Sequence, residues 1–221
     1  MKNDLVAVIT VRKGSVRVKN KNFKLFCGKN LLIHKIETLK NVGNLHDIIV
    51  NTDSDDAIKI AKDYGVGFKR RDDYYASSEC SNSEFWSNIA KNTDSEFIMF
   101  THCTNPLITK ETYQKMIEIF NKSNKENDSF NTVTEVKEFL YLNSKPINFE
   151  PTKSPNSQNL PDVVKLNFAV NILSTDLMFK KKSLIGDNPF FFKLDQIEGF
   201  DINSNNDFEF AEFLFKKYRQ S

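Results

Sequence analysis

The stretch from Leu5 to Asn22, LVAVITVRKGSVRVKNKN, decides the fold because it joins a buried strand to a basic loop. Leu5–Val11 is a continuous run of apolar, mostly β-branched residues, which is typical of a strand covered on both faces. Residues 12–22 are polar and strongly basic. In a parallel sheet flanked by helices, ligands bind beyond the carboxyl ends of the strands. A basic loop at this place therefore predicts a polyphosphate site.

The loop offers three kinds of phosphate-binding group. Gly14 allows close backbone approach, and the amides of a loop around Gly14 and Ser15 can form an anion nest. Arginine is a planar two-pronged donor, whereas lysine acts as a point charge. The cations are Arg12, Lys13, Arg17, Lys19 and Lys21. The alternative is a solvated basic turn.

Two common phosphate motifs do not match here. The loop has no G-x-G-x-x-G, which argues against a dinucleotide fold. Gly28-Lys29 lacks the upstream glycine of a P-loop, because Phe23 holds that place, and Asn30 replaces the Ser or Thr.

The rest of the chain alternates strand-like and helix-like segments, which predicts an α/β, doubly wound, mostly parallel sheet of the Rossmann-like nucleotidyltransferase kind. Further strands are expected at Asp47–Val50, Val66–Phe68, Phe97–Phe100, Asn131–Val136 and Val164–Ile172. Helices are expected at Leu31–Leu39, Ser54–Tyr64, Lys110–Phe120 and Asn205–Tyr218, and a polar loop at Arg70–Ser83.

We expect the 221 residues to form a single domain with an insertion at residues 138–163. Prolines and polar residues break the pattern there, and few apolar residues remain for a core. The prolines are Pro146, Pro151, Pro155 and Pro161. Such a segment could cover a site or reach a partner subunit; the alternative is a disordered surface loop.

The net charge, the lengths of the apolar stretches and the cysteine content argue against several classes of function. The net charge of +2 gives no support for nucleic-acid binding. No apolar stretch approaches the ~18 residues of a membrane span. Three widely spaced cysteines without a C-x-x-C pair indicate a reducing compartment and exclude a cysteine zinc site. The expected location is the cytoplasm.

Several motifs, in collinear order over nearly the whole chain, resemble those of the acylneuraminate and KDO cytidylyltransferase family. VRKGSVRVKNKN at 11–22 is similar to A-R-x-G-S-K-G-I-x-x-K-N, GKNLLIH at 28–34 to G-K-P-L-I-x-H, and NTDS at 51–54 to S-T-D-S. Arg71 with ASS at 76–78 resembles R-P-x-x-L-A-x-D, and TNPL at 104–107 resembles T-S-P-L. LP at 160–161 and KLNFA at 165–169 resemble L-P-x-x-x-R-x-N-G-A, and DINS at 201–204 with Asp207 resembles D-I-D-T-x-x-D.

The resemblance implies a homodimeric enzyme that joins CMP from CTP to an acidic sugar such as a sialic-acid-like nonulosonic acid, releasing pyrophosphate. It implies that Arg12 and Lys21 hold the triphosphate beside Gly14, Ser15, Arg17 and Asn22. Arg71 would read the cytosine and Asn82 would face the ribose. The acceptor side would comprise His102, Thr104, Lys165 and Asn167. Asp201, with Asn203, would hold Mg²⁺, and Asp201 would act with Arg12 and Lys21 in catalysis.

Departures from the family pattern lie mainly on the acceptor side. Ile108, Ser157 and Lys165 each stand where the family has arginine, which argues against ordinary N-acetylneuraminate as the acceptor. Val16 replaces a lysine, and Arg17 beside it could supply that charge. Asn203 replaces a metal-binding aspartate, so it would contribute one charge fewer.

Two other functions stay open from the sequence. Asp53-Ser54-Asp55 could be the metal-binding D-x-D of a nucleotide-sugar glycosyltransferase, although its acids also suit the start of a helix. Asn203 allows a non-catalytic nucleotide-binding paralogue. Ser204 and Asp207 have the spacing of a helix cap, so Asp207 is expected to cap rather than to bind metal.

Overall fold

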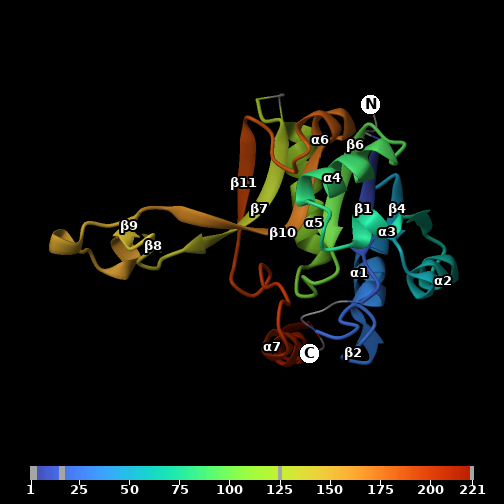
Figure 1. Ribbon diagram of the computed structural model, residues 1–221, viewed down its shortest axis with the longest axis horizontal. Coiled ribbons are helices and arrows are strands. Elements are labelled where there is room, and N and C mark those ends of the chain that lie inside the picture. The colour runs from blue at the N-terminus through green and yellow to red at the C-terminus, as the bar shows by residue number, and fades with distance from the viewer. Residues whose placement is uncertain (1–3, 15–17, 124–125, 220–221) are drawn as a thin grey trace.

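A seven-stranded sheet forms the centre of the computed structural model, which describes residues 4–14, 18–123 and 126–219 (Figure 1). The strand order is β11-β7-β10-β6-β1-β4-β5. The strands are β1 (Leu5–Val11), β4 (Asp47–Thr52), β5 (Gly67–Arg70), β6 (Phe97–His102), β7 (Ser129–Val136), β10 (Val163–Ser174) and β11 (Pro189–Leu194). Neighbouring strands are parallel except that β10 runs antiparallel to β6 and β7. The predicted mostly parallel α/β sheet is confirmed.

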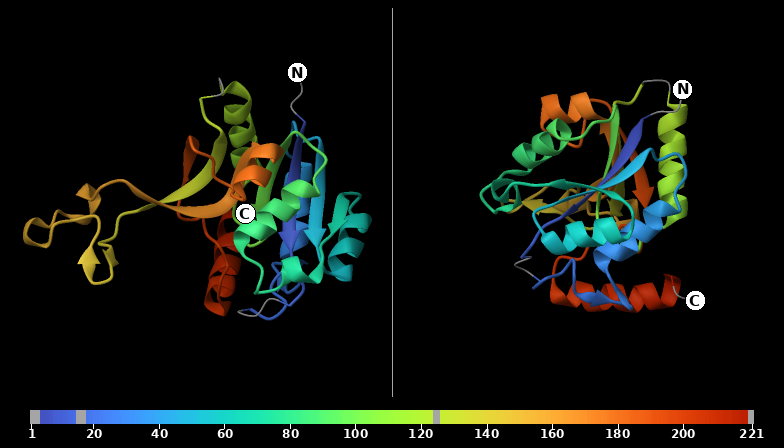
Figure 2. Two further views of the ribbon diagram at one scale, coloured as in Figure 1. Left: turned by 45° about the horizontal axis from the view of Figure 1, so that its top comes forward. Right: turned by 90° about the vertical axis from the view of Figure 1, so that its right-hand side faces the viewer.

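Helices cover both faces of the sheet (Figure 2). They are α1 (Leu31–Lys40), α2 (Asp55–Asp63), α3 (Asp73–Ala76), α4 (Asn82–Lys91), α5 (Lys110–Lys122), α6 (Thr175–Lys181) and α7 (Asn205–Arg219). Alternate residues of β1 enter two separate cores: Ile9 packs in the core that contains α1 and α5, and Val8 packs in the core that contains α4 and α6. This two-sided burial is the reason why β1 is apolar at every position.

Side-chain caps fix where the helices begin. Asn30 accepts a hydrogen bond of 2.9 Å from the amide of Ile33 at the start of α1. In a capping box at α4, the Ser81 hydroxyl accepts from the Glu84 amide while the Glu84 carboxylate accepts from the Ser81 amide. The prediction of a continuous loop at Arg70–Ser83 is wrong, because α3 lies inside it and α4 begins at Asn82.

The segment between β7 and β10 leaves the body of the molecule as an arm (Figure 1). It contains the short strands β8 (Tyr141–Leu142) and β9 (Lys145–Pro146), followed by two 3₁₀ turns at Pro151–Lys153 and Ser157–Asn159. Two short strands, β2 (Leu25–Phe26) and β3 (Lys29–Asn30), pair beside α1. Among the described residues, no helix is both long and apolar enough to cross a membrane.

Candidate active site

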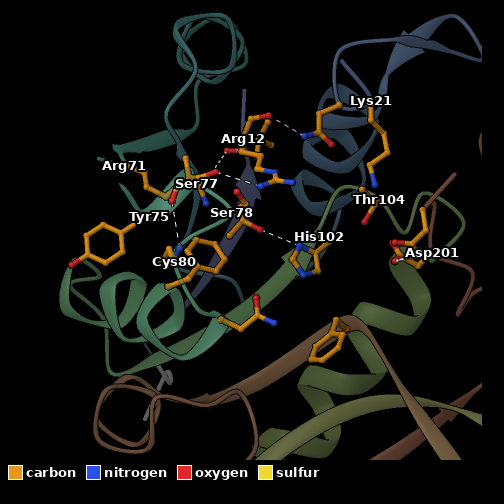
Figure 3. Close-up of a pocket in the computed structure, with 18 of the residues that line it drawn as sticks. Arg12, Lys21, Arg71, Tyr75, Ser77, Ser78, Cys80, His102, Thr104 and Asp201 are labelled. Carbon is orange, nitrogen blue, oxygen red and sulfur yellow. Dashed lines mark hydrogen bonds between the residues drawn. The ribbon is translucent and has the colours of Figure 1, made fainter. Parts of the chain in front are cut away.

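A cavity of about 470 Å³ lies at the carboxyl ends of β1 and β6. Its walls come from six segments: the loop after β1, Arg71, the α3–α4 region, the end of β6, a bulge in β10 and the loop before α7. Figure 3 shows two groups of side chains facing each other across this space, with His102 between them. One group contains Arg12, Arg71, Tyr75, Ser77, Ser78 and Cys80, and the other contains Lys21, Thr104 and Asp201.

The basic loop contributes Arg12, Lys21 and Asn22 to the lining, as the sequence predicted for a polyphosphate site. Lys21 Nζ donates a 2.5 Å hydrogen bond to the carbonyl of Ile202, which ties the basic loop to the loop that carries Asp201. The Asn22 side chain is buried, and its Oδ1 accepts a hydrogen bond from the Cys103 thiol at 3.2 Å. Ser15 and Arg17 lie outside the described residues. Gly14 has a left-handed φ of 73°, which glycine adopts without strain, but it does not line the cavity.

Arg71 is buried in the cavity wall, and its guanidinium is only partly used by the protein. One terminal nitrogen donates to the carbonyl of Val11, and the same nitrogen lies 3.6 Å from Asp53 Oδ1. The guanidinium also lies 4.9 Å from the Phe85 ring centroid. Its Nε is buried and has no hydrogen-bond partner among the residues that the structure describes. A buried donor without an acceptor is costly, so it fits an acceptor supplied by a ligand.

His102 stands at the end of β6 with Nδ1 3.1 Å from the Thr10 hydroxyl. Burial lowers the pKa of His102 to about 4, whereas the nearby carboxylate of Asp201 acts in the opposite direction. The imidazole is therefore neutral near pH 7, and its ring packs edge-on against Phe100 at 4.9 Å between centroids. A neutral ring can orient a sugar hydroxyl or amide by hydrogen bonding.

Asp201 and Asn203 have geometry that fits a hard cation. The Asn203 amide donates to Asp201 Oδ2 at 2.8 Å, and Asp201 Oδ1 is buried with no partner in the described parts of the chain. One carboxylate with a carbonyl oxygen and several waters is an ordinary way to hold Mg²⁺. The parts of the chain that the structure describes contain no cluster of three or more His, Cys, Asp or Glu that could hold a metal. A cation here would therefore need further ligands from substrate phosphates or water.

Asp207 belongs to the helix cap, as expected. Its carboxylate accepts hydrogen bonds from the amides of Asn203 and Ser204 at 2.9 and 2.7 Å, and its own amide donates to the Ser204 hydroxyl. This cap orders the loop between Asp201 and α7.

Of the remaining predicted residues, Asn82, Thr104 and Asn167 line the cavity and Lys165 does not. Asn167 lines it, but its side chain is occupied by internal hydrogen bonds with Thr132, Thr134 and the amide of Ala169. Lys165 is exposed on β10 opposite Thr134 and is not part of the cavity lining.

The D-x-D carboxylates are occupied by other contacts. Asp53 Oδ1 accepts from the amide of Lys13 at 2.9 Å and also faces Arg71. Asp55 lies in the first turn of α2 and pairs with Arg70. These contacts make Asp53 a support for the basic loop, which weakens the glycosyltransferase interpretation.

Sequence reasoning missed the aromatic part of the lining, namely Tyr75, Phe85 and Phe168. Tyr75 belongs to α3, which lies inside the wrongly predicted loop, and Phe85 belongs to α4, which begins at the end of that loop. A signal for Phe168 was present, because the motif that residues 165–169 resemble has glycine at this position.

Comparisons with known proteins agree on one family. The profile of the cytidylyltransferase family matches residues 6–160. Pseudaminic acid cytidylyltransferase of Campylobacter jejuni is 28% identical and aligns over 100% of this chain and 99% of its own length. CMP-N,N'-diacetyllegionaminic acid synthase of C. jejuni is 25% identical over 96% of this chain and 94% of its own. A flagellin modification protein of Campylobacter coli is also 25% identical, over 97% and 96%.

Two solved structures share the fold. CMP:2-keto-3-deoxy-manno-octonic acid synthetase in complex with CTP superimposes with a TM-score of 0.74 at 13% identity and covers 97% of this chain and 99% of its own. The 4-diphosphocytidyl-2C-methyl-D-erythritol synthase of Anaerococcus prevotii gives a TM-score of 0.71 at 14% identity, with 97% of each chain covered.

Proposed function

This chain belongs to the cytidylyltransferase family and is a CTP-dependent nucleotidyltransferase, and we propose that it joins the CMP part of CTP to an acidic sugar of the nonulosonic class. Pyrophosphate is the other product. The names of the relatives support this acceptor class, since they act on pseudaminic acid and on diacetyllegionaminic acid.

One observation carries the proposal: Arg12, Lys21, Arg71 and Asp201 line the same cavity. Arg12 and Lys21 suit a triphosphate, and the carboxylate of Asp201 suits a phosphate-bound cation. Arg71 offers its unpaired Nε to the cytosine, whose O2 and N3 are acceptors.

The reaction is an in-line attack of a sugar hydroxyl on the α-phosphorus of CTP. Such a transfer needs positioning and charge neutralisation rather than a protein nucleophile. Arg12 and Lys21 bind the triphosphate, and the neutral His102 orients the acceptor. Asp201 and the carbonyl oxygen of Asn203 would hold Mg²⁺, which would neutralise charge at the α-phosphate.

We also propose that the enzyme is a homodimer that uses the arm. Four large apolar side chains of the arm are exposed: Phe139 by 43%, Tyr141 by 58%, Leu142 by 62% and Ile147 by 58%. Exposed apolar surface of this kind marks interaction sites. Lys165 lies at the base of the arm, so a partner subunit could complete the acceptor side around it. A cytoplasmic location is part of the proposal, supported by the absence of a disulfide among the three cysteines.

The test is pyrophosphate release from CTP with Mg²⁺ across a panel of acidic sugars that includes pseudaminic, diacetyllegionaminic and N-acetylneuraminic acids and KDO. We expect turnover by the wild type and none by Asp201→Ala. CTP binding without turnover on any acceptor and with any divalent metal would instead support a non-catalytic paralogue.

A further inference from the structure

Phe168 has a backbone conformation that phenylalanine rarely adopts. Its φ is 55°, in the left-handed region, where a bulky side chain is a conformational outlier. Glycine adopts this conformation without strain, and the motif that residues 165–169 resemble has glycine there. The chain thus keeps a large aromatic side chain where the backbone favours none.

Hydrogen bonds of the neighbouring residue hold this conformation in place. The register of β10 against β7 shifts between Leu166 and Asn171, which forms a bulge. Within it, Asn167 Oδ1 accepts from the Thr132 hydroxyl at 2.7 Å, and Asn167 Nδ2 donates to the Thr134 hydroxyl at 2.9 Å. Bulges re-aim side chains, and strained residues persist where their surroundings over-determine them, often at functional sites.

The bulge directs the Phe168 ring to the wall of the active-site cavity, beside His102. Its centroid lies 6.4 Å from that of His102 and 6.3 Å from that of Trp86. Phe85 lines the same cavity. Next to the imidazole, Phe168 and Phe85 therefore make this part of the wall aromatic.

Two positions near this wall offer a ligand no side-chain hydrogen bond. Both ends of the Asn167 amide are engaged by threonines, and Ile108 is buried in the core rather than presented to the cavity. An aromatic wall within an otherwise polar cavity suits a substituent with a methyl or other apolar end.

We propose that Phe168 is a specificity-determining residue for the acceptor. Its ring packs against an apolar substituent of the acidic sugar, such as the methyl of an acylamido group or a deoxy carbon, and disfavours acceptors that carry only hydroxyls there. This inference rests on the proposed function, because it concerns the acceptor of the same reaction.

The experiment compares kcat/KM for pseudaminic acid, which carries acylamido groups, and for KDO, which carries hydroxyls in their place. One methyl in an apolar pocket discriminates by about 10–200-fold. We expect Phe168→Gly to lower the preference for the acylamido sugar by about ten-fold or more, and Phe168→Leu to keep most of it. The KM for CTP should stay within about two-fold in both.

Two controls separate specificity from folding. Phe191→Leu, which changes a 43% exposed phenylalanine on β11 outside the cavity, should leave the preference unchanged. Thermal unfolding checks that each variant is folded. A preference ratio that is equal in wild type and Phe168→Gly, or an equal rise in the KM for CTP, would overturn the role of Phe168 while the proposed function stands. A wild type without turnover on any acceptor would overturn both.

Discussion

Asn203 donates a 2.8 Å hydrogen bond to Oδ2 of Asp201, while Oδ1 of the same carboxylate is buried and contacts no hydrogen-bonding group of residues 4–14, 18–123 or 126–219. The asparagine thus supports the carboxylate through its amide nitrogen, and in the proposed metal site its carbonyl oxygen would be the ligand. An aspartate at 203 would add a charge but would lose this donor. We therefore expect the Asp201–Asn203 pair to determine how strongly a divalent metal stabilises this loop.

We predict that Asn203→Asp makes the stability of the folded protein more dependent on Mg²⁺. Without metal, two neighbouring carboxylates repel each other and lower the stability of the folded state. With Mg²⁺, the extra charge strengthens binding, and binding to the folded state raises the melting temperature. Turnover at low Mg²⁺ should equal or exceed that of the wild type. Melting curves with and without Mg²⁺ test this, and an unchanged Mg²⁺ response would remove Asn203 from the metal site.

The basic loop should bind CTP mainly through Arg12 and Lys21. Truncating Arg12 to alanine removes a charge-assisted contact, for which roughly 1.5–3 kcal/mol is usual. We expect the Kd for CTP in the presence of Mg²⁺, measured by calorimetry, to rise by about ten-fold or more. Lys19→Ala, which removes an exposed cation of the same loop outside the cavity, is the matched control.

Lys21→Ala should lower a kinetic constant that Arg12→Ala affects less, namely kcat. Besides its charge, Lys21 provides the 2.5 Å hydrogen bond to Ile202 that connects the two loops of the site. Its loss should therefore lower kcat as well as CTP affinity, because Asp201 follows the position of Ile202. If both variants bind CTP like the wild type, the basic loop is not the triphosphate site.

Lys35 on α1 gives a prediction about pH. Its ammonium is buried and donates to the Asn105 carbonyl at 3.0 Å and to the Tyr113 hydroxyl at 2.6 Å, with no carboxylate bonded to it. Burial lowers the pKa of Lys35 from 10.5 to about 7, while Cys103 acts in the opposite direction. Between these values the unfolded chain holds a proton that the folded chain has released. This difference raises stability with increasing pH.

Compared with Lys35→Met, the wild type should therefore gain stability between pH 7 and about 9. The variant has no ammonium to titrate, so the difference in free energy of unfolding between the two proteins should change in favour of the wild type as the pH rises. Urea unfolding at three pH values measures it. Lys59→Met, at an exposed lysine of α2, should show no such trend. A difference that is constant with pH would mean that Lys35 does not titrate in this window.

Local sequence patterns predicted the first strand and the basic loop that follows it. The apolar run of β1 and the basic loop after it follow directly from the order of residues, and both lie where the sequence placed them. The α4 helix was missed although Phe85 and Trp86, four residues before the buried Ile89 and Ala90, give it the apolar stripe of an amphipathic helix.

Contacts between distant segments could not be read in the same way. The left-handed backbone of Phe168 is stabilised by Asn167 hydrogen bonds to threonines of β7, more than thirty residues earlier. Likewise, Lys21 meets Ile202 because β1 and β6 are neighbours in the sheet and the Ile202 amide donates to the carbonyl of Thr104, which follows β6. Motifs identified which residues gather at the site, but only the structure gave their partners.

The arm provides the last prediction, that the enzyme is a dimer in which the partner subunit completes the acceptor side. In the arm, Phe149 packs against Phe139 and Tyr141, with centroids 4.8 and 5.4 Å apart, yet Tyr141 and Leu142 remain more than half exposed. Light scattering should report a dimer for the wild type and monomers for Tyr141→Ser/Leu142→Ser. Phe179→Ser, at a 46% exposed residue of α6, should stay dimeric.

Steady-state kinetics then show whether the partner subunit completes the acceptor site or the two subunits only associate. Lys165 lies outside the cavity of a single chain, at the base of the arm, so its ammonium would reach an acceptor carboxylate only in the assembled enzyme. Lys165→Ala should raise the KM for the acidic sugar far more than the KM for CTP, because the ammonium acts on the group that carries the opposing charge. The monomeric arm variant should show the same selective rise. A fully active monomer, or equal damage to both constants, would show that the acceptor side is complete within one chain.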